Sequence, residues 1–177
     1  GDIIIKDRTG EGVINDEDRT VIGNSIPRFT FGLNLGFEYK GFDFSCFFQG
    51  VGKADGYVTM EAIQPMGING ARKEHYKESF NPQDPKPGAY FPRILSSDYN
   101  YAYMSHWVQD ASYIRLKNLQ IGYSFKIKGL NQLRVYASGE NLFTATKYRT
   151  WDPETPVGAR GFYPNVAVYS MGVNLNF

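Results

Sequence analysis

Residues Phe29 to Lys40 read FTFGLNLGFEYK, and they alternate strictly between two kinds of side chain. Every odd position holds a large apolar or aromatic residue, whereas every even position holds a small, polar or charged one. Since successive strand residues point to opposite faces of a sheet, this pattern gives one apolar face and one polar face. The stretch therefore predicts a β-strand whose odd positions lie in an apolar environment.

The same alternation recurs in four later segments, so the sequence predicts five strands. Their expected bounds are about 28–40, 42–52, 112–126, 132–146 and 165–177. Lys40-Gly41 alone joins the first two, and glycine in second place suits a tight type I′ hairpin because it takes a positive φ without strain. Between Leu116 and Leu119 the large apolar residues change from even to odd positions. This change indicates either a β-bulge near Lys117–Asn118 or a strand leaving the membrane.

The connections between these strands alternate in length. Lys40-Gly41 and about 126–131 are short, whereas about 53–111 and 147–164 are long. Outer-membrane barrels show this asymmetry, with short periplasmic turns and long extracellular loops. We therefore expect an all-β fold, in which an extracellular acidic loop, 1–27, precedes antiparallel transmembrane barrel strands in 28–177.

Two smaller expectations follow from the same segments. The loop 53–111 is rich in Pro, Gly and Asn, and we expect one short helix around 70–80 within it. Five strands would leave two open edges, which lipid cannot satisfy, so these strands would be a section of a larger closed barrel.

Composition and motifs argue against several other classes. The chain of 177 residues carries 19 Lys and Arg against 18 Asp and Glu, so charge does not favour nucleic acid. No stretch approaches the roughly 18 consecutive apolar residues of a transmembrane helix. Cys46 and the two distant histidines offer no zinc spacing. No nucleophile motif or acid–base pair appears, so we expect a protein that is not an enzyme.

A soluble β-sandwich also alternates, and it is the main alternative. A sandwich would place Lys, Glu, Thr and Arg on its water face, whereas the polar positions here are mostly Gly, Asn, Ser and Thr. Tyr39, Phe42, Phe125 and Phe177 all fall at the short-turn ends, where a barrel has an aromatic girdle. These features favour the barrel over a soluble calcium-dependent carbohydrate-binding sandwich.

A series of short motifs, in one order along nearly the whole chain, resembles the C-terminal part of SusC/RagA-family TonB-linked outer-membrane transporters. The motifs are Gly1–Asp7, Gly10–Ile14, Asp18-Arg19, Ile22–Asn24, Pro27, Phe31–Asn34, Tyr39–Asp43, Phe48–Gly50, Pro92-Arg93, Trp107–Asp110, Ser112–Asn118, Ile121–Tyr123, Asn141–Thr144, Lys147-Tyr148, Asp152–Glu154 and Gly172–Phe177. The terminal Phe177, preceded by alternating apolar residues, is similar to the signal that barrel-assembly machinery reads.

This resemblance implies the last strands of a 22-stranded barrel in the outer membrane of a Gram-negative bacterium. It implies a plug domain inside the barrel, energy from TonB acting on a region outside this chain, and a SusD-like surface lipoprotein as lid. The implied substrate is an oligosaccharide or a peptide, and the implied function is its import.

Residues Asp7 to Asp18 have the layout of a twelve-residue calcium loop. The ligands would be the side chains of Asp7, Thr9, Glu11 and Asp18 and the carbonyl of Val13, with Gly12 at the turn. Thr9 and Glu11 stand where Asp or Asn is usual, and Asp18 replaces the usual bidentate Glu. The alternative is an acidic surface loop held by its own hydrogen bonds.

The long loops carry aromatic residues that are candidates for contact with a substrate or a partner. Tyr90, Trp107 and Trp151 are the main ones, with Tyr99, Tyr101 and Tyr103 beside them. The alternative is that they pack the loops together.

Charged residues on the polar positions of the strands form a second candidate group. They are Glu38, Lys117, Arg134 and Glu140. They either line a transport path or form an interior charge network that braces the wall or holds the plug.

Overall fold

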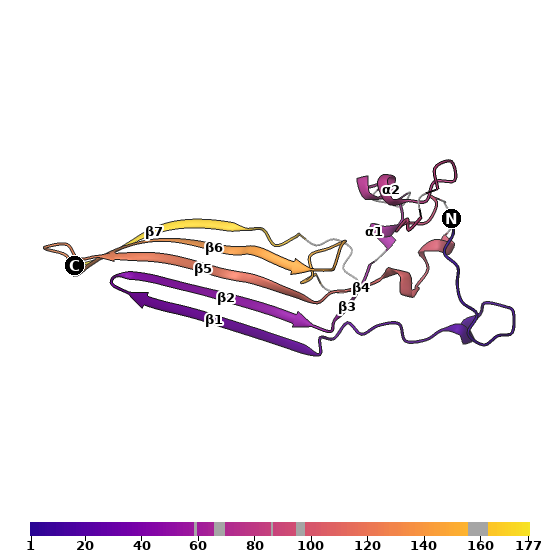
Figure 1. Cartoon of the computed structure of the whole chain (residues 1–177), viewed down its shortest axis with the longest axis horizontal. Helices are drawn as coiled ribbons and strands as arrows, with labels where there is room; N and C mark the ends of the chain where they lie inside the picture. The colour runs from indigo at the N-terminus through magenta and orange to yellow at the C-terminus, as the bar shows by residue number, and fades with distance from the viewer. Residues whose placement is uncertain (59, 66–69, 86, 95–97, 156–162) are drawn as a thin grey trace. The chain divides into compact units, whose positions relative to one another are not determined.

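Five long antiparallel strands form the main body of the fold (Figure 1). This computed structural model describes residues 1–58, 60–65, 70–85, 87–94, 98–155 and 163–177. The strands are β1 (Phe29–Tyr39), β2 (Phe42–Gly52), β5 (Tyr113–Phe125), β6 (Gln132–Thr146) and β7 (Val168–Asn176). They pair in the order β1-β2-β5-β6-β7, which confirms the prediction of an antiparallel all-β fold.

The observed strands begin and end within one residue of the expected bounds, except that β7 begins at Val168 rather than near 165. Each sheet neighbour is also the next long strand along the chain. The short connections therefore lie at one end of the sheet, and Figure 1 shows them beside the C-terminus.

The turn between β1 and β2 is of type I′, as predicted. Lys40 has φ 49° and Gly41 has φ 88°, so both central residues are left-handed. The carbonyl of Gly41 accepts a 2.7 Å hydrogen bond from the amide of Ser124, which joins the turn to the end of β5. A Cβ atom on Gly41 would lie 2.7 Å from the carbonyl oxygen of Ser124, so the turn requires glycine for space as well as for φ.

A β-bulge at Lys117 explains the change of parity in β5. Phe47 of β2 pairs with Asn118, and Phe48 pairs with Leu116, so Lys117 is the extra residue. The pairing of β5 with β6 is also interrupted between Leu116 and Asn118. The bulge interpretation is thus confirmed, and the apolar residues before the bulge return to the same face as those after it.

The register gathers most of the large apolar side chains of the sheet on one face, called here the apolar face. Its members are Phe29, Phe31, Leu33, Leu35, Phe37 and Tyr39 of β1; Phe42, Phe44, Cys46 and Phe48 of β2; Ile114, Leu116, Leu119, Ile121, Tyr123 and Phe125 of β5; Leu133, Val135, Ala137 and Phe143 of β6; and Tyr169, Met171, Val173 and Leu175 of β7.

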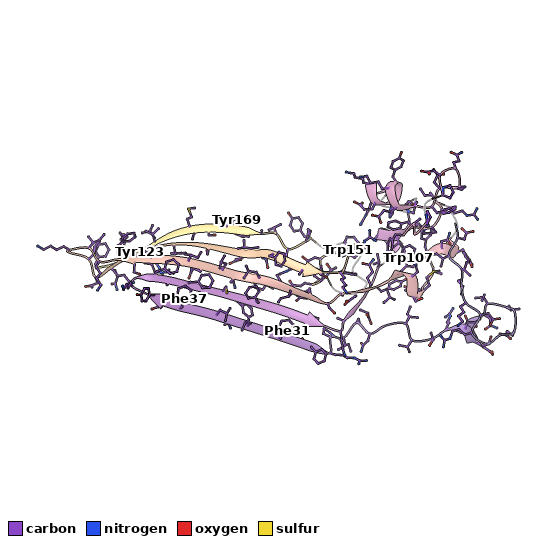
Figure 2. The ribbon with its side chains drawn as sticks, viewed as in Figure 1. Phe31, Phe37, Trp107, Tyr123, Trp151 and Tyr169 are labelled. Atoms are coloured by element: carbon purple, nitrogen blue, oxygen red, sulfur yellow. The ribbon has the colours of Figure 1, made fainter. Side chains whose placement is uncertain are left out.

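Much of the apolar face is exposed: Leu33 is 49% exposed, Phe37 54% and Met171 90%. In the described part of this unit no second sheet lies against it, and Figure 2 shows Phe37 and Tyr169 on a single layer of strands.

The opposite face, called here the polar face, carries short polar side chains and several glycines. Asn34, Ser45, Gln120, Ser138 and Asn174 are typical members. Its charged residues are few, and two groups of them form ion pairs that are described below.

The chain divides into two compact units. The sheet unit contains the five long strands, and its described residues lie in 24–56, 110–155 and 163–177. The loop unit takes its described residues from 1–23 and 57–109. The loop 57–109 thus groups with residues 1–23. The expected division into an extracellular loop, 1–27, and a barrel section, 28–177, stays a prediction.

The described residues of the long loop contain α1 (Met60–Ile63) and α2 (Lys73–Glu78), and α2 lies where one short helix was expected. Three 3-10 helices, η1 (Asp16–Asp18), η2 (Asp98–Tyr101) and η3 (Ser105–Trp107), and a two-stranded sheet of β3 (Asp55–Tyr57) and β4 (Val108–Asp110) complete the fold. No helix among the described residues has the length and apolar character needed to cross a membrane.

The loop unit has a small core of its own. Its fully or almost fully buried side chains are Val58, Ala62, Ile63, His75, Phe91, Asn100, Tyr101 and Trp107. The loop unit therefore has an internal core, although some of its apolar residues, such as Ile4 and Val21, stay exposed. The apolar face of the sheet has no such core against it among the described residues.

Candidate functional site

Arg115 is the most deeply buried charged residue of the sheet unit, with a side chain 2% exposed. It lies in β5 on the polar face, opposite Thr144 of β6. Its Nε donates a 2.8 Å hydrogen bond to Oγ1 of Thr144. Its Nη2 donates to both carboxylate oxygens of Asp152, at 2.9 and 2.8 Å. A strand residue thereby holds the loop that follows β6.

Glu154, two residues further on, completes this arrangement. Its carboxylate lies 3.0 Å from Nη1 of Arg115 and 2.7 Å from Nζ of Lys117, and it accepts a 3.0 Å hydrogen bond from the hydroxyl of Tyr113. Lys117 is the bulge residue, so the irregularity in β5 supplies the second cation. Arg115, Lys117, Asp152 and Glu154 together are called here the clamp.

The clamp pairs two cations with two carboxylates, and its side chains are largely shielded from water. Side-chain exposure is 2% for Arg115, 9% for Asp152 and 18% for Glu154. Removing one partner of such a buried pair leaves an uncompensated charge, which costs about 3–5 kcal/mol. The loop after β6 is therefore held firmly on the polar face.

A second ion pair lies toward the short-turn end of the polar face. Arg134 of β6 donates through Nε to Asp43 of β2 at 2.9 Å, reaching across β5. A side chain on Gly122 of β5 would collide with both partners, so this glycine makes the space for the pair. Arg134 also lies over the ring of Tyr136, 4.8 Å from its centroid.

These contacts locate the charged residues that the sequence singled out as lining a path. Lys117 pairs with Glu154 in the loop after β6, and Arg134 pairs across β5 with Asp43 of β2. Glu38 and Glu140 are exposed. A bracing network is therefore visible for two of the four, and a role in lining a path stays a prediction.

Sequence reasoning missed Arg115, Asp152 and Glu154 as a group. The sequence did carry a signal for Arg115. This residue precedes the bulge, so it lies on the polar face, as Tyr113 does two residues earlier. The partner acids could not be assigned, since they lie 37 residues or more along the chain in a loop without periodicity.

The acidic loop, Asp7 to Asp18, is closed by hydrogen bonds to its own backbone. Asp7 accepts from the amides of Gly10 and Gly12, at 2.6 and 2.7 Å. Asp18 accepts from the amides of Arg8 and Asn15, at 2.6 and 3.0 Å. These bonds favour the ionised carboxylates, and they lower the pKa of Asp7 and the pKa of Asp18.

The proposed calcium ligands converge partly in this loop. Oγ1 of Thr9 lies 3.2 Å from Asp7, 3.3 Å from Glu11 and 3.4 Å from Asp18. Within the described ranges no three His, Cys, Asp or Glu side chains are grouped as a metal site would group them. The structure thus shows the hydrogen-bonded loop, and calcium binding at these residues and the Val13 carbonyl stays a prediction.

The aromatic candidates differ in their surroundings (Figure 2). Trp107 is fully buried in the loop unit, and its indole Nε1 donates to the carbonyl of Asn100 at 3.0 Å. Tyr90 is half-buried and contacts Trp107 edge to face, with ring centroids 5.9 Å apart. Trp151 is half-buried in the sheet unit, next to Asp152 of the clamp. Trp107 therefore packs the loop core, whereas Tyr90 and Trp151 keep exposed surface.

The first residues of the chain are fastened to this loop core. Asp2 receives two hydrogen bonds from Arg93, at 2.7 and 2.6 Å, and one from Asn100 at 2.9 Å. The Arg93 guanidinium lowers the pKa of Asp2 to about 2. The amide of Ile3 donates to the side chain of the same Asn100, at 2.9 Å.

Comparison with known proteins gives consistent matches. No protein-family model matches the chain. The TonB-dependent receptors P3 and P39 of Formosa agariphila are 34% and 33% identical to it over 201 residues, covering the whole chain. The TonB-dependent receptor SusC of Bacteroides thetaiotaomicron is 27% identical over 182 residues, covering 97% of the chain. The chain spans about a fifth of the length of these relatives, 19%, 19% and 17%.

The fold matches solved structures of the RagAB transporter. A structure of the RagAB peptide transporter superposes with a TM-score of 0.72 and 24% identity, over 93% of this chain and 19% of that one. The open-open state of the RagAB peptide importer gives 0.70 and 24%, over 89% and 18%. The chain thus matches one section of TonB-dependent receptors in sequence, and it shares its fold with the corresponding part of the RagAB transporter. The resemblance to the C-terminal part of SusC/RagA-type receptors is confirmed.

We expect the buried ion pairs of the clamp to contribute much more to the free energy of unfolding than an exposed ion pair does. Asp152→Ala leaves Arg115 with half of its acidic partners, and we expect it to lower the free energy of unfolding by about 3 kcal/mol. The measurement is urea unfolding of the purified protein dispersed in a mild detergent.

Arg19→Ala is the matched control, because Arg19 pairs with Asp16 at 2.8 Å while both side chains are more than four-fifths exposed. We expect little change for this variant. Equal losses in the two variants would show that the clamp does not hold the loop.

Proposed function

We propose that the chain forms one section of the wall of a TonB-dependent importer in the outer membrane of a Gram-negative bacterium. The observation that carries this proposal is the apolar face, which has members in all five long strands and is largely exposed in β1 and β7. Lipid would cover this face, and further strands of the barrel would pair with the free edges of β1 and β7.

Magnitudes support a lipid environment over water. Burying a side chain such as Leu33 or Phe37 is worth about 1.5–3 kcal/mol, whereas a whole domain is stable by only about 5–15 kcal/mol. Many of these side chains are about half exposed, so leaving a face of this size in water would forfeit a free energy at least comparable with the stability of an ordinary domain. The soluble sandwich is disfavoured because its apolar face would need a second sheet, which the described residues do not form against it.

The polar face would line the interior of the barrel, and the loop unit would lie outside the cell. The expected partners are the plug domain and the remaining strands, TonB, and a SusD-like lipoprotein over the extracellular side. The imported substrate would be an oligosaccharide or a peptide, and the fold match to a peptide importer supports the peptide class. Tyr90 and Trp151 are the proposed contact residues with exposed surface, and no step requires a catalytic group.

The uncovered face predicts that the 177-residue chain, purified alone, does not stay monomeric in plain buffer. We expect large aggregates in analytical ultracentrifugation without detergent, and dispersed species when a mild detergent covers the apolar face. A matched variant that carries Leu33→Asn and Phe37→Asn should depend less on detergent, whereas Asn34→Ser on the polar face should behave as the parent. A compact monomer in buffer alone would mean that these side chains form an internal core, as in the sandwich.

Calcium binding by the acidic loop is a separate part of the proposal, supported by the approach of Asp7, Glu11 and Asp18 to Thr9. A calcium site predicts that millimolar calcium slows proteolysis of the segment 7–18 relative to a chelator. Asp18→Asn should remove this protection, while Asp16→Asn, whose partner is Arg19, should not.

The same loop has a pH dependence that needs no metal. Its carboxylates have lowered pKa values in the folded state, so they stabilise the loop above the ordinary value of 3.8. That stabilisation is lost as the pH falls through the lowered values.

The outcome that would contradict the calcium site is equal proteolysis of the segment 7–18 with calcium and with chelator. It would show that hydrogen bonds alone close the loop.

A further inference from the structure

We propose that the short-turn end of the sheet binds the headgroups of anionic phospholipids through Lys40, Lys126 and Lys128. This inference rests on the proposed function, because it requires the apolar face to lie in lipid. Lys40 lies in the β1–β2 turn, and the other two lie in the connection between β5 and β6. All three side chains are exposed.

The two turns lie together at one end of the sheet. The amide of Ser124, near the end of β5, donates to the carbonyl of Gly41 at 2.7 Å. Phe42, the first residue after the turn, pairs with Tyr123 of β5. The three lysines therefore belong to one rim rather than to separate surfaces.

The charge of this rim is not balanced locally. Neither 39–42 nor 126–131 contains an Asp or a Glu, although the chain as a whole has nearly equal numbers of acids and bases. The nearest acids, Glu38 and Asp43, lie on the polar face, and Asp43 is already paired with Arg134. In the described part of the chain none of the ion pairs uses a rim lysine.

Aromatic residues place these cations at the edge of the hydrocarbon. Tyr39, Phe42, Tyr123 and Phe125 all lie on the apolar face at the same end as the turns. The ammonium group of Lys40 lies over the ring of Tyr39, 5.1 Å from its centroid. Aromatic rings of this kind mark the level of the lipid headgroups, and lysines reach from the apolar surface to that level.

A phosphodiester is the group that fits this rim. Its negative charge would meet three ammonium groups that lack acidic partners, and its acyl chains would continue along the apolar face. A lipid with a net negative charge is preferred over a zwitterionic one, because a choline or ethanolamine group would bring a positive charge to a cationic rim.

The test uses the protein extracted from its native membrane in a neutral detergent. The micelles are titrated with phosphatidylglycerol or with phosphatidylcholine, and the bound lipid is counted by native mass spectrometry. We expect tighter binding of phosphatidylglycerol, and a loss of affinity of about fivefold for each lysine replaced in the series K40Q, K126Q and K128Q.

The control variant carries K6Q, K73Q and K77Q, which remove the same charge from exposed sites in the loop unit. It should keep the phosphatidylglycerol affinity of the parent protein. Equal affinity for the two lipids, or equal losses in the two triple variants, would overturn the inference. A protein that needs no detergent would overturn the proposed function as well, so the two failures are distinguishable.

Discussion

A chain that crosses hydrocarbon must pair every backbone amide and carbonyl with another strand, while the side chains that face outward must be apolar. If the sheet is a barrel wall, as proposed, the rest of its structure depends on this constraint. It requires a side-chain period of two over the full length of each strand, so that one face stays apolar from β1 to β7. It also requires register to be kept across all neighbours, because a slip of one residue would turn the apolar set to the other side.

The bulge at Lys117 shows how register is kept where the sequence breaks the period. Without it, Ile114 and Leu116 would lie on the polar face, and Arg115 would lie on the apolar face. The extra residue prevents this, and it also brings Lys117 to Glu154. One irregularity thus preserves the apolar face and completes the clamp on the polar face.

The two units differ in how they bury side chains. The loop unit buries Trp107, His75 and Asn100 and satisfies them with internal partners. The nitrogen Nε2 of His75, for example, lies 2.8 Å from the carbonyl oxygen of Ala62. The sheet unit instead leaves large apolar residues outside and keeps its ions on the polar face.

Sequence alone predicted what depends on local periodicity and turn chemistry. The strands, the type I′ turn at Lys40-Gly41 and the bulge all follow from patterns a few residues long. The clamp did not follow, because Arg115 finds its acids in a loop whose course is set by tertiary contacts. The burial of Trp107 also could not be read from the sequence, since a tryptophan in a long loop suits a core and a binding surface equally well. Calcium binding at Asp7 and Asp18 stays a prediction.

The orientation of β1 is the most direct measure of the barrel-wall assignment. Residues 29–39 would be replaced by cysteine one at a time in a Cys46→Ser background, spin-labelled, and studied in lipid. Collision rates with oxygen, which enters lipid, and with a water-soluble nickel complex would be measured by electron paramagnetic resonance. We expect a period of two, with odd positions open to oxygen and even positions open to nickel. Odd positions closed to both reagents would show an internal core and would contradict a wall facing lipid.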